Sequence, residues 1–380
     1  MSHHNRTVCQ ILPALEGGGV ERGTLEIAQA LHDASMPSIV ISNGGKLVAN
    51  LDKMGVRHIK LPVHSKNPFL AIVTAVRLHY ALKKNKVGLV HVRSRMPAWI
   101  LKMAMLGLKD ITMISTYHGT YGIKPAWIKK RYNSVMLSGE KVIAVSHHIR
   151  KHLLENYPIK DEKIVVIHRG ADLDFFNPST VSEDDIVQMA NQWGVDRSRP
   201  IVLLAGRRTR IKGHKLVMDA IKKINRPDVQ CVFVGGDKGN VDYTQELEQY
   251  IADNGLAEQV KLIGDCAKMP VAYAVSDIMI SATTKPESFG RTVSEAQLMG
   301  AVVVAANHGG ASETVDDGVT GFHFKPNDAD DLAAVLLKAL DMTAEQKAVM
   351  TSRASDEVKT HFTTEQMCAK TLDLYRQILG

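Results

Sequence analysis

Short runs rich in Val and Ile alternate along this chain with longer stretches whose apolar residues recur every three or four positions. The short runs predict buried strands and the longer stretches predict amphipathic helices. In the first half, strands are expected at residues 8–12, 38–42, 57–61, 88–92, 112–116, 141–145 and 163–167. Helices are expected between them at residues 20–32, 49–54, 68–84, 97–106, 129–138 and 147–156. This alternation predicts a parallel sheet with helices on both faces.

The same pattern starts again in the second half. Strands are expected at residues 200–205, 229–235, 260–263, 278–281, 302–305 and 321–324. Helices are expected at residues 215–224, 243–254, 269–275, 291–299, 310–315, 328–340, 344–359 and 364–379. The polar, Pro- and Gly-punctuated residues 170–200 are interpreted as a linker. The chain is therefore predicted to be an α/β protein of two Rossmann-like, doubly wound domains facing a central cleft, over residues 1–178 and 199–363.

Charge is unevenly distributed along the 380 residues, whose net charge is +7. Residues 1–178 hold 25 Lys and Arg against 12 Asp and Glu, a net charge of +13, and 12 of the 16 histidines. A basic first half predicts an anionic partner, which could be nucleic acid, a phosphorylated sugar or a membrane surface. No RNP, KH or helix-turn-helix pattern is present, so nucleic acid is disfavoured.

Neither a membrane span nor a signal-peptide core is present in the sequence, which predicts a cytoplasmic protein. The four cysteines are scattered, without CxxC or Cys/His ligand spacing, and no metal site is expected. We expect reduced, buried thiols at Cys9, Cys231, Cys266 and Cys368.

Ligands of such sheets bind in the loops at the carboxyl ends of the strands. The first of these loops, residues 16–23, is rich in glycine, and Gly18 and Gly19 would let the backbone approach a ligand closely. Its spacing is not the G-x-G-x-x-G fingerprint, which disfavours a nicotinamide cofactor. A plain turn into a helix remains the alternative interpretation.

A basic loop follows the first strand of the second half. It starts at Gly206 and carries four cations within six residues. Among them, Arg207 and Lys212 are predicted to neutralise a leaving diphosphate. A solvated basic loop is the alternative. Gly235, at the end of the next strand, is predicted to line the nucleotide pocket.

The segment 285–295 contains two carboxylates eight residues apart, Glu287 and Glu295. Pro286 and Gly290 disfavour helix at its start, so Glu287 is expected on a loop and Glu295 in the following helix. The free N–H groups at the start of that helix would hold a phosphate between the two acids. Such a site could bind a nucleotide-sugar donor, and the residues predicted to contact it are Phe289, Gly290, Arg291 and Thr292.

Other candidates lie in the basic half. His118 follows an expected strand and is a candidate catalytic residue that could bond a sugar hydroxyl or support charge at the reacting carbon, although a lone His is more often structural. The segment 124–132 mixes cations and aromatics, which fits docking on an anionic acceptor or a solvated helix equally well. The predicted acceptor-binding residues are Arg93, Arg95, Lys129, Lys130 and Arg131. The D-x-D pair at Asp172 and Asp174 is interpreted as a structural turn rather than a metal site.

Together these segments resemble the GT-B retaining glycosyltransferases of family 4, across essentially the whole chain. The resemblance is carried by the Glu287…Glu295 element, by Gly206-Arg207…Lys212-Gly213, by the glycine-rich loop, by His118 and by residues 142–146 and 308–322. It implies that Arg207 and Lys212 bind the donor diphosphate, Glu295 the ribose and Glu287 the sugar. It also implies retention of anomeric configuration without a metal or other cofactor. Residues 364–380 would cross back to the first domain.

Within that family, the chain looks most like bacterial lipopolysaccharide-core transferases, with Arg169 departing from the more frequent Asn. The resemblance implies transfer of a hexose from a nucleotide-diphosphate sugar to an anionic envelope glycolipid, by a cytoplasmic protein peripheral to the inner membrane face. A nucleotide-sugar 2-epimerase on the same fold is one alternative. A non-catalytic envelope-carbohydrate binding module is the other.

Overall fold

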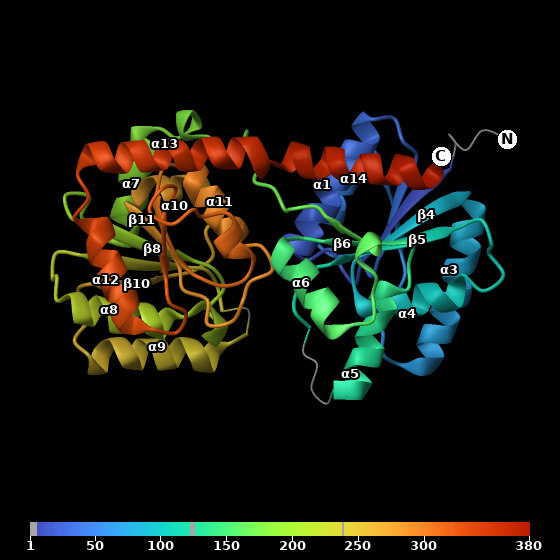
Figure 1. Cartoon of the computed structure of the whole chain (residues 1–380), viewed down its shortest axis with the longest axis horizontal. Coiled ribbons are helices and arrows are strands. Elements are labelled where there is room, and N and C mark those ends of the chain that lie inside the picture. The colour runs from blue at the N-terminus through green and yellow to red at the C-terminus, as the bar shows by residue number, and fades with distance from the viewer. Residues whose placement is uncertain (1–5, 122–125, 238) are drawn as a thin grey trace. The chain divides into compact units, whose positions relative to one another are not determined.

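The computed structural model describes residues 6–121, 126–237 and 239–380. Its internal contacts divide the chain into two units, which are coloured from blue to red along the sequence in Figure 1. Unit 1 comprises Met1–Arg169 together with Glu365–Gly380. Unit 2 comprises Gly170–Thr364.

Unit 1 is built on a parallel sheet, in which the described residues form seven strands in the order β3-β2-β1-β4-β5-β6-β7. Gln10 of β1 is in register with Val40 of β2 and His91 of β4. The order reverses direction at β1, which is where ligands bind in open α/β sheets. The strands are β1 (Thr7–Ile11), β2 (Ser38–Ser42), β3 (Arg57–Lys60), β4 (Val87–Val92), β5 (Thr112–Tyr117), β6 (Lys141–Ala144) and β7 (Ile164–Val166).

Helices cover both faces of this sheet, because successive strand residues point to opposite sides. Cys9 and Ile11 pack into one core with α3, α4 and α6, whereas Val8 packs into another with α1 and α14. Asn67 caps α3 by accepting a hydrogen bond from Leu70 N, and Pro68 occupies its first turn. The helices are α1 (Gly19–Asp33), α2 (Val48–Lys53), α3 (Pro68–Lys84), α4 (Arg95–Ala104), α5 (Ala126–Asn133), α6 (His147–Asn156) and α14 (Thr364–Leu379).

Unit 2 repeats this plan with six strands among its described residues, all parallel, in the order β10-β9-β8-β11-β12-β13. Ile201 and Leu203 of β8 face α7, α10, α11 and α13, and Val202 and Leu204 face α8, α9 and α12. The strands are β8 (Ile201–Ala205), β9 (Gln230–Val234), β10 (Val260–Ile263), β11 (Ile278–Ser281), β12 (Val302–Ala306) and β13 (Phe322–Phe324). The helices are α7 (Glu183–Trp193), α8 (His214–Ile224), α9 (Val241–Asp253), α10 (Met269–Val275), α11 (Arg291–Leu298), α12 (Ala329–Leu340) and α13 (Ala344–His361).

The structure thus has the two Rossmann-like parallel sheets that the sequence predicts, but the expected linker is different. Residues 170–200 contain helix α7, which packs against α10 in unit 2. Ser182 caps its start, and Gly194 ends it in the left-handed conformation. The interpretation of this whole segment as a linker was wrong.

Two smaller elements also differ from expectation. The helix expected at residues 129–138 is α5 followed by a 3-10 helix, Ser134–Leu137. The helix expected at residues 310–315 is a 3-10 turn, Gly310–Glu313. Lys124 and Pro125, which belong to the mixed basic and aromatic segment, lie outside the described residues.

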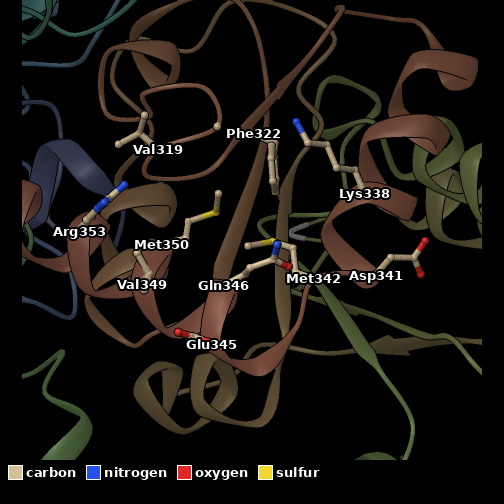
Figure 2. Close-up of a pocket in the computed structure, with 11 residues that line it drawn as sticks. Val319, Phe322, Lys338, Asp341, Met342, Glu345, Gln346, Val349, Met350 and Arg353 are labelled. Carbon is tan, nitrogen blue, oxygen red and sulfur yellow. The ribbon is translucent and has the colours of Figure 1, made fainter.

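A cavity of about 450 Å³ opens between β13, α12 and α13 in unit 2, and Figure 2 shows the side chains around it. Phe322 and Met350 form part of its apolar wall, and the ammonium of Lys338 lies 4.7 Å from the Phe322 ring centroid. Among the described residues that line it, none belongs to the predicted site.

Candidate active site

The loop after β8 places a lysine against the backbone of a glycine. Lys212 ends the 3-10 turn η5 (Arg210–Lys212), and its stem passes over Gly206. A Cβ at Gly206 would lie 3.0 Å from Lys212 Cε, and a Cβ at Gly235 would lie 2.2 Å from the Gly206 carbonyl oxygen. The ends of β8 and β9 therefore approach each other closely, as the glycines there allow.

The four cations of this loop have different surroundings. Arg208 donates to the carbonyl of Ile263 at 3.3 Å, and Arg210 pairs with Glu246. Lys212 donates to Glu287 in an ion pair that is largely shielded from solvent. Arg207 is exposed and forms no ion pair with any side chain in the described part of the chain. Thus the structure brings together one predicted cation and one predicted acid, and leaves Arg207 accessible.

The loop that carries Glu287 is clamped by a neighbouring loop. Glu287 forms a parallel bridge with Gly309, and its carbonyl accepts a hydrogen bond of 2.7 Å from Gly310 N. A Cβ at Gly309 would lie 2.6 Å from the Glu287 carbonyl oxygen, and one at Gly310 would lie 2.3 Å from that of Ser288. Two glycines thus fix the backbone of Glu287 under the Lys212 ammonium.

Helix α11 follows directly, with Gly290 as its N-cap residue. Arg291 and Thr292 are its first two residues and are partly exposed, so their N–H groups lie at a helix N-terminus. Phe289 is buried against Phe362, with ring centroids 5.7 Å apart. Glu295 is 5% exposed.

The Glu295 carboxylate accepts a hydrogen bond of 3.1 Å from the Tyr273 hydroxyl on α10. A buried carboxylate needs such a donor, since an unpaired one would be costly. Tyr273 was not predicted, because nothing in the sequence links a short apolar helix to Glu295.

Unit 1 carries a second polar cluster, at the carboxyl ends of its strands. Arg169 Nη2 lies 3.1 Å from His118 Nδ1 and donates to the Gly19 carbonyl at 3.3 Å. Gly19 begins α1, and Gly18 is its N-cap residue. The predicted His118 and the glycine-rich loop are therefore joined by Arg169.

The residues predicted to bind the acceptor substrate differ in burial and in their partners. Arg93 is 2% exposed and donates to Gln10 Oε1 through Nε and Nη2, which favours a structural role. Arg95 lies 4.1 Å from the Tyr121 ring centroid and donates to Asn133. On α5, Lys129 and Arg131 are exposed and Lys130 is partly buried.

His214 makes the stability of unit 2 dependent on pH. It is buried beside Phe233 and Tyr243, and burial, followed by the charge of Lys212, lowers its pKa from 6.5 to about 4. Between these two values, the unfolded chain takes up a proton that the folded chain does not. The free energy of unfolding should therefore fall by about 3 kcal/mol as the pH drops from about 6.5 to 4. Urea unfolding of wild type and His214→Gln across this range measures it, with exposed His361→Gln as the control. An equal acid loss in His214→Gln would contradict the assignment.

Both halves of the chain match families of known proteins. The family described as "Glycosyl transferases group 1" matches residues 185–356, and "Glycosyltransferase Family 4" matches residues 17–175. A solved structure of a glycosyltransferase from Rickettsia africae is 38% identical, covers 99% of both chains and superposes with a TM-score of 0.92.

This chain belongs to the glycosyltransferase family.

Two further relatives of this glycosyltransferase are more distant. The structure of Anabaena HepE in complex with UDP is 23% identical, with a TM-score of 0.85 over 98% of this chain and 100% of HepE, and HepE has also been solved with UDP-glucose. Spore coat protein SA of Bacillus subtilis is 22% identical over 96% of both chains. The HepE likeness establishes the fold, which is GT-B.

The glycosyltransferase also contains structural partners that sequence patterns did not reveal. Gln10 and Glu246 are two of them: Gln10 accepts from Arg93, and Glu246 accepts from Arg210 and Lys215. Neither stands in a motif, and each lies far along the chain from the cation that it binds. Only the packing of strands and helices brings these pairs together.

Proposed function

We propose that this glycosyltransferase moves a hexose from a nucleoside-diphosphate sugar to an anionic glycolipid of the cell envelope, in the synthesis of lipopolysaccharide core. The observation that carries the proposal is the Lys212–Glu287 ion pair. It joins a cation suited to a diphosphate to an acid suited to sugar hydroxyls, at the carboxyl ends of the unit 2 strands. Such strand ends bind ligands in doubly wound sheets.

The donor diphosphate would lie between Arg207, Lys212 and the N-terminus of α11. Two cations neutralise its charge, and the N–H groups of Arg291 and Thr292 donate to its oxygens. Glu295 would meet the ribose and Glu287 the sugar. The UDP-glucose complex of HepE supports a uridine nucleotide and a hexose as the first donor to test.

In the proposed reaction, an acceptor hydroxyl oxygen forms a bond to the anomeric carbon while the bond to the phosphate oxygen breaks. Both events take place on one face of the sugar, so configuration is retained. The departing phosphate takes the acceptor proton, and no protein base is used. Arg207 and Lys212 stabilise the charge that develops on the leaving diphosphate. We propose that this charge stabilisation needs no metal ion.

An exposed apolar surface on unit 1 supports the proposal of a glycolipid acceptor. Among the described residues, no helix is long and apolar enough to span a membrane. Five side chains of α3, spaced so as to share one side of the helix, are nevertheless exposed. We call them the α3 face: Phe69, Ile72, Val73, Val76 and Tyr80. Exposed apolar patches of this kind mark interaction sites.

Charge around the α3 face favours an anionic membrane as its occupant. Neither α3 nor the adjoining α4 contains an acidic residue, while Arg77, Lys83, Lys84 and Lys102 are exposed on them. Apolar residues bordered by cations are the signature of binding at an anionic lipid interface. We propose that this face rests on the inner surface of the cytoplasmic membrane, where a glycolipid acceptor is available.

Substitution within the α3 face should weaken membrane binding. The double variant Ile72→Ser, Val76→Ser removes side chains that are 57% and 51% exposed, so the fold should be unaffected. Loss of two inserted side chains should lower affinity for phosphatidylglycerol vesicles by tenfold or more in a sedimentation assay. Val349→Ser, 47% exposed on α13, is the matched control. Unchanged binding, or equal binding to neutral phosphatidylcholine vesicles, would contradict this role.

The function itself is tested by nucleotide release. Purified protein is given UDP-, GDP- and ADP-sugars, each with and without a lipid-A-core extract, and free nucleoside diphosphate is measured. We expect release from one donor that depends on the extract. Conversion of the donor sugar without release would identify a 2-epimerase. Donor binding with neither release nor conversion, using an extract shown to accept sugar from a known transferase, would identify a binding module.

A further inference from the structure

The hydrogen bond between Arg169 and His118 is possible with only one protonation pattern of the neutral histidine ring. Arg169 Nη2 lies 3.1 Å from His118 Nδ1. A guanidinium carries donors and has no acceptor. His118 Nδ1 must therefore accept the hydrogen bond, and the proton of the neutral ring is on Nε2.

That Nε2 is buried and has no hydrogen-bond partner among the residues that the structure describes. His91, its neighbour on β4, is different: Tyr375 Oη lies 2.5 Å from Nδ1 and Thr116 Oγ1 lies 2.6 Å from Nε2. Buried polar atoms are nearly always paired, so an unpaired one in a native structure requires an explanation. Both ring nitrogens of His91 have hydrogen-bond partners. The Nε2–H group of His118 has no acceptor among the described residues.

The surroundings keep His118 neutral. Burial lowers its pKa well below the ordinary value, and the positive charges of Arg169 and Arg93 lower it further, with a smaller effect from His91. The backbone of His118 also interacts with Tyr121, and Glu26 and Tyr375 face Arg93 from α1 and α14. Two cations thus outweigh the acids in this cluster, and the pKa of His118 stays low.

Arg169 is held in place by two helices, α1 and α14. It donates to the Gly19 carbonyl of α1 at 3.3 Å, and its Nη1 lies 3.5 Å from Met367 Sδ of α14. Helix α1 makes room for it at Gly23, where a Cβ would lie 2.2 Å from Arg169 Nη1. Glycine is unfavourable inside a helix, so its presence there fits a need for space.

We infer that Arg169 is a positioning residue that holds His118 as the neutral Nε2–H form, and that His118 donates a hydrogen bond to an oxygen of the sugar substrate instead of acting as a base. The substrate oxygen would be the missing acceptor of the buried N–H group. This inference rests on the proposed function for its substrate, whereas the protonation pattern is independent of it.

The protonation pattern is tested by long-range ¹H–¹⁵N correlation spectra of the ¹⁵N-histidine-labelled full-length protein. The His118 signals are assigned by comparison with His118→Asn. In the wild type, we expect an unprotonated Nδ1, a protonated Nε2 and no titration between pH 5.5 and 8. Arg169→Met removes both a donor and a charge, so the Nδ1 shift should change and the pKa should rise toward its ordinary value. A proton on Nδ1 in the wild type, or unchanged signals in Arg169→Met, would overturn the inference.

Gly23→Ala should also break the Arg169–His118 hydrogen bond, while leaving Arg169 in the sequence. Alanine favours the helix, and its methyl group should displace the guanidinium tip without unfolding the protein. Its spectrum should resemble that of Arg169→Met, and adding it to Arg169→Met should change nothing further. Arg150→Met, on the exposed surface of α6, is the control for loss of an arginine. Additive effects of Gly23→Ala and Arg169→Met would show that Gly23 does not act through Arg169.

Transfer kinetics supply a readout that a purely structural role would not change. In Arg169→Met and Gly23→Ala, part of the neutral His118 population should carry its proton on Nδ1 instead of Nε2. kcat/KM should therefore fall most at high pH and be regained at low pH, where both ring nitrogens are protonated. Arg169→Lys keeps a donor and should retain more activity than Arg169→Met. If the protein transfers no sugar, the proposed function fails while the spectra still decide the protonation pattern. A loss of kcat/KM that is the same at every pH would overturn the role of Arg169.

Discussion

Replacing Lys212 by methionine should lower the rate of sugar transfer by about a hundredfold or more, as losses of preorganised donors do in other enzymes. Lys212 is held in place by its ion pair with Glu287. Its charge therefore needs little reorganisation to meet the leaving diphosphate. Methionine preserves the length of the stem over Gly206 but removes the charge. The measurement is acceptor-dependent release of nucleoside diphosphate at saturating donor.

Lys223→Met is the matched control for this prediction, since Lys223 also pairs with a carboxylate in unit 2, that of Asp330. Its transfer rate should stay near that of the wild type. Arg207→Met should show a loss of the same order as Lys212→Met. If Lys212→Met and Arg207→Met both transfer at near-normal rates, electrostatic stabilisation of the leaving group by this loop is wrong.

Gly213→Ala should destabilise unit 2 by about 3–5 kcal/mol. Gly213 has a φ of 75°, which costs an alanine about 1–2 kcal/mol. Its Cβ would also lie 1.9 Å from the carbonyl oxygen of Ala282, at the end of β11. Backbone cannot move aside as a side chain can, so the clash must distort β11 or the start of α8. Chemical unfolding followed by circular dichroism measures the loss.

Gly194→Ala separates the two causes. Gly194 has a similar φ of 65°, but a Cβ there meets no atom within 4 Å. It should lose about 1–2 kcal/mol, from backbone conformation alone. Equal losses at Gly194 and Gly213 would show that the Ala282 contact is relieved without strain.

Most of the fold can be predicted because the sheets are buried on both faces. Their strands are Val- and Ile-rich runs that stand out from the helices around them. Helix α7 was missed although Ser182 and Gly194 bracket it and Met189, Ala190 and Trp193 recur on one side. The polar, Pro- and Gly-punctuated composition of residues 170–200 was interpreted as a linker, yet the acidic residues in the first turn of α7 favour a helix.

The candidate site could be predicted only as far as it is local in sequence. Glycine and charge spacing indicated the loops of Lys212 and Glu287, but their ion pair depends on how β8 and β11 are placed in the sheet. Arg93 shows that a local sequence pattern can also suggest a binding residue where the side chain is buried. It follows a buried strand, as a ligand-binding residue would, but β4 lies beside β1 and Gln10 binds the guanidinium in the interior.

The C-terminal helix sets the order in which the protein can be completed during synthesis. Residues 365–380 supply Tyr375, Met367 and their neighbours to the core of unit 1, and His91 meets its Tyr375 partner there. The ribosome must make residues 170–364 in between, which takes about 10–40 s at ordinary elongation rates. For that interval, the apolar side of β1 and β4 is without its α14 cover on the nascent chain. Unit 1 begins first and is finished last, so part of its apolar core stays uncovered during the synthesis of the whole of unit 2.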